Sequence, residues 1–130
     1  MPINVMDSNY HSFIKGVVPE LQARNIALLA MKTLADGRFF PKKETLGGIQ
    51  WESEDPVVPN RLSIADALNF VWSLPVSVLI TGAENAQLMN EKIELAKSFT
   101  VMNEEKRMAL IDKVADLADG KVEYYKNPVA

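Results

Sequence analysis

Cysteine is absent from the 130 residues of this chain, and several kinds of site are excluded with it. Disulfides, thiolate metal sites and cysteine nucleophiles are impossible, and the absence fits a reducing compartment. Long apolar runs are missing too. No segment reaches the roughly 18 apolar residues of a membrane-spanning helix, and the amino end has no basic region followed by an apolar stretch. The sequence therefore predicts a soluble, cytoplasmic protein with no membrane partner.

Runs of like charge are also missing. The 14 lysines and arginines and the 17 acidic residues are spread along the chain, so nothing indicates a nucleic-acid partner. The single histidine, His11, lies near Asp7, Ser8 and Tyr10. Acid-base chemistry or a metal would be one interpretation, but one histidine with one carboxylate makes no ligand set, so we favour a loop or helix-start histidine.

Apolar residues, by contrast, are plentiful at 48%, enough for one domain with a buried core. Three short apolar segments predict strands, at residues 1–6, 26–31 and 76–80. The second has six apolar residues in a row, which is typical of a parallel strand covered on both faces. Helical spacing lies between and after these segments, and strands alternating with helices predict an α/β fold with a parallel sheet.

The helices are predicted from apolar positions at three-and-four spacing, at residues 11–25, 64–74, 85–98 and 103–120. Pro19 is expected in the first turn of a new helix, and Ser63 and Asn85 are good helix caps. Residues 35–61, rich in glycine and proline, predict a loop of a length that is usually functional or mobile. The tail, residues 121–130, is expected to pack loosely or hang free.

Three apolar parallel strands would leave two open sheet edges, a liability for a free-standing protein. The chain therefore looks incomplete.

Three stretches of the sequence together resemble the aldo/keto reductase family. They are MPINVMDSNYHSF with PELQARNIALLAMKTLADG, then ADALNFVWSLPVSVLITGAENAQL, then LAKSF before an acidic helix. Their order and spacing resemble the last three strand-helix units of that (β/α)8 barrel. The resemblance implies a partial TIM barrel over residues 1–120 and, in the complete barrel, nicotinamide-dependent reduction of a small carbonyl compound.

The family's catalytic tyrosine, lysine, aspartate and histidine belong to earlier strands, which this chain does not contain. The resemblance therefore implies no catalytic residue here, and we assign no such role to Tyr10, Lys32, Asp7 or His11.

Cofactor contacts are implied for two loops. Met31 matches a side chain packed against the nicotinamide, with Lys32 beside it, and Leu34 and Gly37 match the loop around the pyrophosphate. The turn near the adenosine phosphate is matched by Thr81, Gly82, Ala83 and Glu84, and residues further along the same helix by Leu88 and Lys92.

The cofactor itself is NADP or NAD. Family members that prefer the 2'-phosphate usually have basic groups where this chain has Gly82 and Leu88, and many have an asparagine beside the adenine where it has Lys92.

Apart from the resemblance, Met31 would be a core methionine and Lys32 a solvated lysine. Trp51 either faces the substrate or packs its loop on the scaffold.

Two functions follow. The chain is the C-terminal part of a reductase whose N-terminal barrel half lies upstream or on another chain. Alternatively, it is a non-catalytic barrel module that covers its open edges by forming a homo-oligomer or by pairing with another chain.

Overall fold

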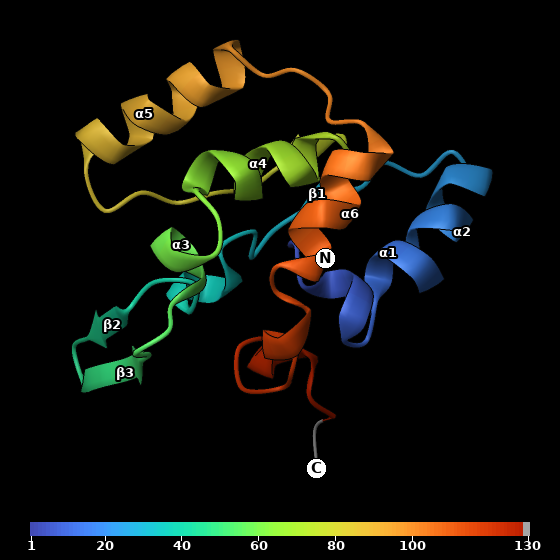
Figure 1. The fold of residues 1–130 in the computed structure, drawn as a ribbon. Helices are drawn as coiled ribbons and strands as arrows, with labels where there is room; N and C mark the ends of the chain where they lie inside the picture. The colour runs from blue at the N-terminus through green and yellow to red at the C-terminus, as the bar shows by residue number, and fades with distance from the viewer. Residues whose placement is uncertain (129–130) are drawn as a thin grey trace.

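Three backbone segments run in parallel through the centre of the molecule, whose computed structural model describes residues 1–128 (Figure 1). β1 (Leu29–Ala30) pairs with β4 (Val78–Leu79). A parallel bridge joins Pro2 to Met31. Ala30 of β1 and the next residue, Met31, accept hydrogen bonds from opposite sides: Ala30 accepts from Ile80, whereas Met31 accepts from Ile3. The amino-terminal segment and β4 therefore flank β1.

This pairing is shorter than predicted. The described residues hold a two-stranded parallel sheet and a bridge rather than three full strands, so the fold is mixed α/β. The prediction of a strand over residues 1–6 was wrong beyond Ile3. The Asn4 side chain accepts from the Met6 N–H at 2.8 Å and turns the backbone into the 3-10 helix Asp7–Asn9.

The sheet is covered on one face only, which corrects the expectation for residues 26–31. Leu28 and Ala30 are buried in the same cluster as Ala67 and Phe70 of α4 (Ile64–Trp72). The other face, hereafter the open face, is formed by four partly exposed side chains: Leu29 at 48%, Met31 at 37%, Val78 at 51% and Ile80 at 48%. The burial alternates because successive strand side chains point to opposite faces.

The helices begin where the capping residues predict. Ser12 caps α1 (Phe13–Gly16), and Pro19 lies in the first turn of α2 (Val18–Ala23). Ser63 and Asp66 form a capping box at α4. Asn85 caps α5 (Ala86–Lys97), and α6 (Glu104–Asp112) ends before the predicted residue 120, with the 3-10 turn Ala115–Leu117 after it. No described helix is long and apolar enough to cross a membrane.

The long loop of residues 35–61 has structure of its own. It begins with the 3-10 turn Ala35–Gly37 and continues as the antiparallel hairpin β2 (Lys42–Thr45) and β3 (Gly48–Glu52), which projects from the body in Figure 1. The short helix α3 (Val57–Asn60) follows. Phe39 and Val57 are buried in the main core, and they hold the two ends of the segment that contains the hairpin in place.

The tail is packed, contrary to expectation. It ends in the 3-10 turn Tyr124–Lys126, and the Lys126 side chain is 1% exposed between Asp7, at 2.7 Å, and Glu123, at 2.9 Å. Burial of a lysine requires such partners. The sequence expectation failed because Asp7 is 119 residues away from Lys126. Residues 129 and 130 lie outside the described part of the chain.

Candidate functional site

The predicted cofactor residues meet at one edge of the sheet. Because β1 and β4 are parallel and Ala30 pairs with Leu79, their carboxyl ends are level with each other. Lys32 follows one end and Thr81 the other. In parallel α/β folds ligands bind at this edge, between the loops that leave it. The two loops thus stand where a shared ligand could contact both.

The loop after β1 is organised around Asp36. Its carboxylate lies 2.7 Å from the Lys32 ammonium and 3.4 Å from that of Lys43, and it accepts a 2.6 Å hydrogen bond from the Tyr124 hydroxyl. Desolvation alone would raise the pKa of Asp36. The hydrogen bonds from Lys32 and Tyr124 and the two lysine charges outweigh it and lower the pKa to about 2.

The backbone of this loop is strained. Lys32, Ala35 and Asp36 have φ of 58°, 50° and 58°, in the left-handed region that L side chains disfavour. Gly37 follows at φ 86°, and a Cβ there would lie 2.8 Å from Cδ of Lys43. The glycine is therefore required by both backbone and packing. Strain of this kind concentrates at ligand-binding loops, although packing here also maintains it.

Met31 and Leu34 have different surroundings. The Met31 side chain is 37% exposed on the open face, where a ligand could reach it. Leu34 is half-buried against the main core.

The turn after β4 gathers the second group of predicted residues. Lys92 reaches back from α5 and donates to Thr81 Oγ1 at 3.1 Å and to the Gly82 carbonyl. Partial burial lowers the pKa of Lys92, an effect that the charge of Glu84 opposes. Asn85 Oδ1 accepts from the Leu88 N–H at 2.9 Å, so one free amide of the helix start is satisfied internally. Ala83 is half-buried and Gly82 exposed in this turn.

The sequence analysis did not identify Arg38, which follows the 3-10 turn after β1. The Arg38 guanidinium lies 4.0 Å from the ring centroid of Tyr124 and 4.9 Å from that of Trp51, and it donates to the Lys121 carbonyl. Trp51 therefore packs its loop against the scaffold, the second of the two interpretations given to it. Only the Tyr-Tyr pair of the tail hinted at these contacts.

Asn4, at the end of the first parallel segment, contacts the tail as well. Its amide donates to Glu123 Oε1 at 2.8 Å and to the Tyr125 hydroxyl at 3.0 Å. Glu123 is fully buried, and burial raises its pKa against the opposing effects of Lys126 and Asn4. Burial also raises the pKa of Tyr125. The tail thus joins the ends of the first two parallel segments.

His11 behaves as the favoured interpretation predicts. It is exposed, with φ 40° and its ring edge-on to Tyr10 at 4.4 Å. Within residues 1–128 no group of three or more potential ligand side chains could hold a metal ion.

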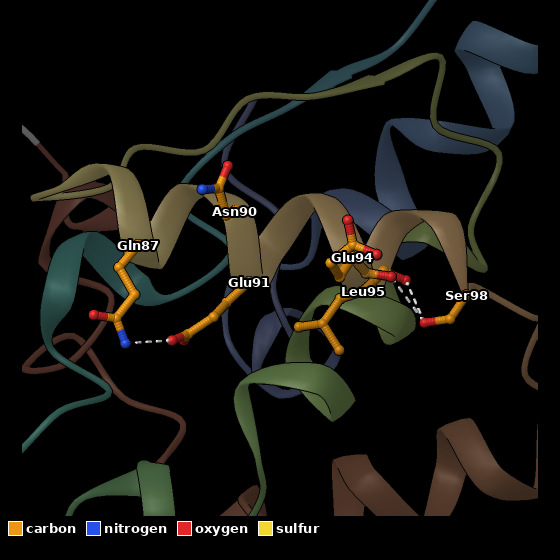
Figure 2. Close-up of a pocket in the computed structure, with 6 residues that line it drawn as sticks. All are labelled: Gln87, Asn90, Glu91, Glu94, Leu95 and Ser98. Carbon is orange, nitrogen blue, oxygen red and sulfur yellow. Dashed lines mark hydrogen bonds between the residues drawn. The ribbon is translucent and has the colours of Figure 1, made fainter.

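An open groove lies along α5, and none of the predicted residues is among those that line it. Figure 2 shows its lining, in which Gln87 donates to Glu91 at 3.2 Å and Ser98 bonds back to the Glu94 carbonyl at 3.0 Å. The remaining lining residues are Asn90 and Leu95. These contacts stay within one helix, so the groove gathers no groups from different elements and offers no convergent site.

Comparison with known proteins bears on the fold of the chain. Neither a sequence family nor a curated protein matches the chain. Among solved structures, the holo form of aldo-keto reductase AKR11C1 from Bacillus halodurans superposes with a TM-score of 0.57 at 13% identity. The chain shares its fold with part of an aldo/keto reductase. The superposition covers 87% of this chain and 41% of that reductase, so the likeness spans less than half of the larger protein. At this identity it concerns the fold alone.

Proposed function

We propose that this chain is the C-terminal portion of an NAD(P)H-dependent aldo/keto reductase and contributes the cofactor-binding loops of a (β/α)8 barrel. The observation that carries the proposal is the order of three parallel segments whose second and third end in polar loops at one edge. The similarity in fold to a reductase of which the chain spans 41% supports it. Under this proposal β1 and β4 are the seventh and eighth barrel strands.

The residues present suit a nicotinamide dinucleotide. The ammonium groups of Lys32, Lys43 and Lys92 reach the two loops at this sheet edge, and Asp36 is the carboxylate that pairs with the first two. Phosphates are bound by such cations and by free amides at a helix start. The bound cofactor would supply the hydride for carbonyl reduction. The chain would hold it, with Met31 beside the nicotinamide and the loop through Gly37 at the pyrophosphate.

The proposal assigns the catalytic groups to the five earlier strand-helix units. The 130 residues alone should therefore not oxidise NADPH in the presence of a panel of aldehydes, followed by absorbance of the reduced nicotinamide. Oxidation above the protein-free rate would show that reactive groups lie within this chain. The coding sequence before Met1, or a neighbouring gene, should encode the missing units, and a region without them would remove most of the support.

Cofactor binding by the chain is testable without catalysis. Addition of NADP to isotopically labelled protein should shift the backbone amide resonances of residues 31–37 and 81–88. Gly82→Asp should weaken the effect, because a carboxylate would repel the phosphates and a Cβ there meets nothing within 4 Å. Gly47→Asp is the matched control, since a Cβ at that glycine has only Thr45 Oγ1, at 3.9 Å, near it. Equal titrations for both variants would contradict the placement.

The second candidate is a non-catalytic module that oligomerises, and the open face favours it. Four apolar side chains on one sheet surface, with an unpaired strand edge beside them, are a surface that proteins usually cover. Light scattering after size exclusion should then show an oligomer that Leu29→Lys dissociates. Val101→Lys, at a 72% exposed residue outside the sheet, should leave the mass unchanged. A monomeric wild-type chain would exclude this candidate.

A further inference from the structure

The packed tail contains a buried group of charges that does not sum to zero. Two carboxylates, Asp7 and Glu123, share one ammonium, that of Lys126, at 2.7 and 2.9 Å, and all three side chains are at most 1% exposed. The ammonium also donates to the Tyr10 carbonyl at 3.0 Å, so its three donors are used. With all three groups ionised, two negative charges and one positive charge leave a net charge of −1 out of contact with water, which is unfavourable.

The two carboxylates differ in how well their oxygens are paired. Each Asp7 oxygen accepts two hydrogen bonds, from Lys126 and from three donors at the start of α1. On Glu123, Oε1 accepts from Asn4 and from Lys126, whereas Oε2 is buried and has no hydrogen-bond partner among residues 1–128. A charged oxygen that is buried without a donor is costly. Oε2 is therefore the atom at which a proton would neutralise the cluster.

The groups around Glu123 act on it in both directions. Burial raises the pKa of Glu123, Lys126 and the Asn4 amide lower it, and the charge of Asp7 raises it, with a net rise. The Tyr125 hydroxyl accepts from the same Asn4 amide at 3.0 Å, and burial raises its pKa as well, so it brings no charge. The preference for a neutral Glu123 thus follows from its surroundings on the amino-terminal segment and on the tail.

Polar contacts hold most of the tail in position. Of residues 121–128, only Val122 belongs to the buried apolar core. The other anchors are hydrogen bonds and ion pairs: Glu123 and Lys126 attach to the amino-terminal segment, and Tyr124 donates to Asp36 of the loop after β1 at 2.6 Å. Release of the tail would therefore uncover the ends of the first two parallel segments together.

We propose that residues 121–128 form a proton-controlled latch over the ends of the first two parallel segments, closed when Glu123 is protonated and loosened when it ionises. The proton adds to Oε2 and brings the net charge of the buried cluster from −1 to 0. Oε1 keeps both of its hydrogen bonds, from Asn4 and from Lys126. In the released tail the carboxylate of Glu123 is in water, where its charge is solvated. Proton uptake therefore favours the docked tail, and rising pH favours its release.

Glu123 and Asp36 respond to pH in opposite senses. The pKa of Glu123 is raised in the folded chain, so its contribution to docking is complete below its ordinary value of 4.5 and is lost as the pH rises through the raised pKa. The pKa of Asp36 is lowered to about 2, so the contribution of its bond to Tyr124 is complete above about pH 4. The latch is therefore tightest slightly above pH 4.

Amide protection measures the latch directly. Protection factors for residues 121–127 of the full chain, corrected for the intrinsic pH dependence of exchange, are followed by NMR between pH 4.5 and 8. They should fall by about tenfold as Glu123 ionises, because the cluster then carries its unbalanced charge. The carboxyl carbon resonance of Glu123 should titrate over the same pH range. The amides of α6, residues 104–112, are the internal reference and should keep their protection.

Variants identify the group that takes up the proton. Glu123→Gln keeps Oε1 and replaces the unpaired oxygen with an uncharged group, so it should keep the latch closed and remove the pH dependence. Glu105→Gln is the matched control, because it makes the same change at an exposed residue of α6, and it should behave as wild type. Lys126→Met leaves both carboxylates without their cation and should open the latch throughout the range. If Lys126→Met does not fold, as judged by circular dichroism, Glu123→Gln retains the test.

Three results would overturn the latch. The first is protection of residues 121–127 that does not change with pH, and the second is an equal fall in wild type and Glu123→Gln. The third is an equal loss of protection in residues 104–112, which would indicate global unfolding rather than release of the tail. No nucleotide enters the experiment, so the latch and the proposed cofactor site can each fail without the other.

Discussion

The loop after β1 and the turn after β4 leave the same edge of one sheet, yet the chain treats them differently. In the first, Asp36 pairs with two lysines, Tyr124 bonds to the same carboxylate, and the tail covers the loop. In the second, no carboxylate among the described residues pairs with Lys92, and α5 has no buried residue. The first loop is therefore held by more contacts from its own chain than the second.

Removing Lys126 should change the free energy of unfolding more than any other substitution proposed below. Lys126→Ala leaves two buried carboxylates, Asp7 and Glu123, without their shared cation, and should lower the free energy of unfolding by about 3–5 kcal/mol. Lys97→Ala on exposed α5 should cost at most about 1 kcal/mol. Urea denaturation followed by circular dichroism measures both. Similar midpoints for the two variants would mean that buried Lys126 does not stabilise the packing of the tail on the amino-terminal turn.

Two glycines give the next comparison. Gly37→Ala should lower the free energy of unfolding by about 1–3 kcal/mol, because its φ is 86° and a Cβ would meet the Lys43 side chain at 2.8 Å. Gly82→Ala in the turn after β4 meets nothing within 4 Å and should stay within about 0.5 kcal/mol of wild type. A larger loss at Gly82 would show that the second turn is the more constrained of the two.

The loss of stability at low pH should come from the loop after β1. The pKa of Asp36 is lowered from 3.8 to about 2, so its contribution to stability is complete above about pH 4 and is lost as the pH falls through about 2. Because the group is partly solvated, the contribution is about 1 kcal/mol. Asp36→Asn should flatten the pH dependence of unfolding in that range, measured by thermal melts between pH 5 and 2. Asp112→Asn, at an exposed residue of α6, should retain the wild-type slope.

The smallest effect should be confined to α5. Asn85→Ala removes the cap of a helix without buried residues, so amide hydrogen exchange should accelerate in residues 86–97 while global stability changes little. Ser63→Ala removes the capping box of buried α4 and should instead lower global stability by about 1 kcal/mol. Global destabilisation by Asn85→Ala would contradict the independence of α5.

The elements found from the sequence were those that local chemistry decides. Ser63 and Asn85 marked helix starts because caps act over three residues, and the apolar runs marked β1 and β4. The sequence of residues 42–52 lacked the alternation of apolar and polar side chains that would have predicted a hairpin. The apolar residues Leu46 and Ile49 in this hairpin are exposed rather than buried. The burial of Lys126 had no local signal in the sequence. Its partner Asp7 and the residues that cover its side chain come from the other end of the chain.

The candidate site was predictable in part. The family resemblance and the parallel order placed Lys32 and Thr81 at one edge, as the structure has them. The pairing of Lys32 with Asp36 and the reach of Lys92 back to Thr81 depend on loop conformation, including three non-glycine residues at positive φ near Asp36. Spacing alone does not encode such a conformation.

The amino end offers a practical consequence. The nitrogen of Met1 donates to the Leu29 carbonyl at 2.7 Å, in line with the bridge between Pro2 and Met31. If a residue were joined to that nitrogen, the resulting peptide N–H would still have the hydrogen this contact uses. A tag or fusion partner is therefore compatible with the amino end.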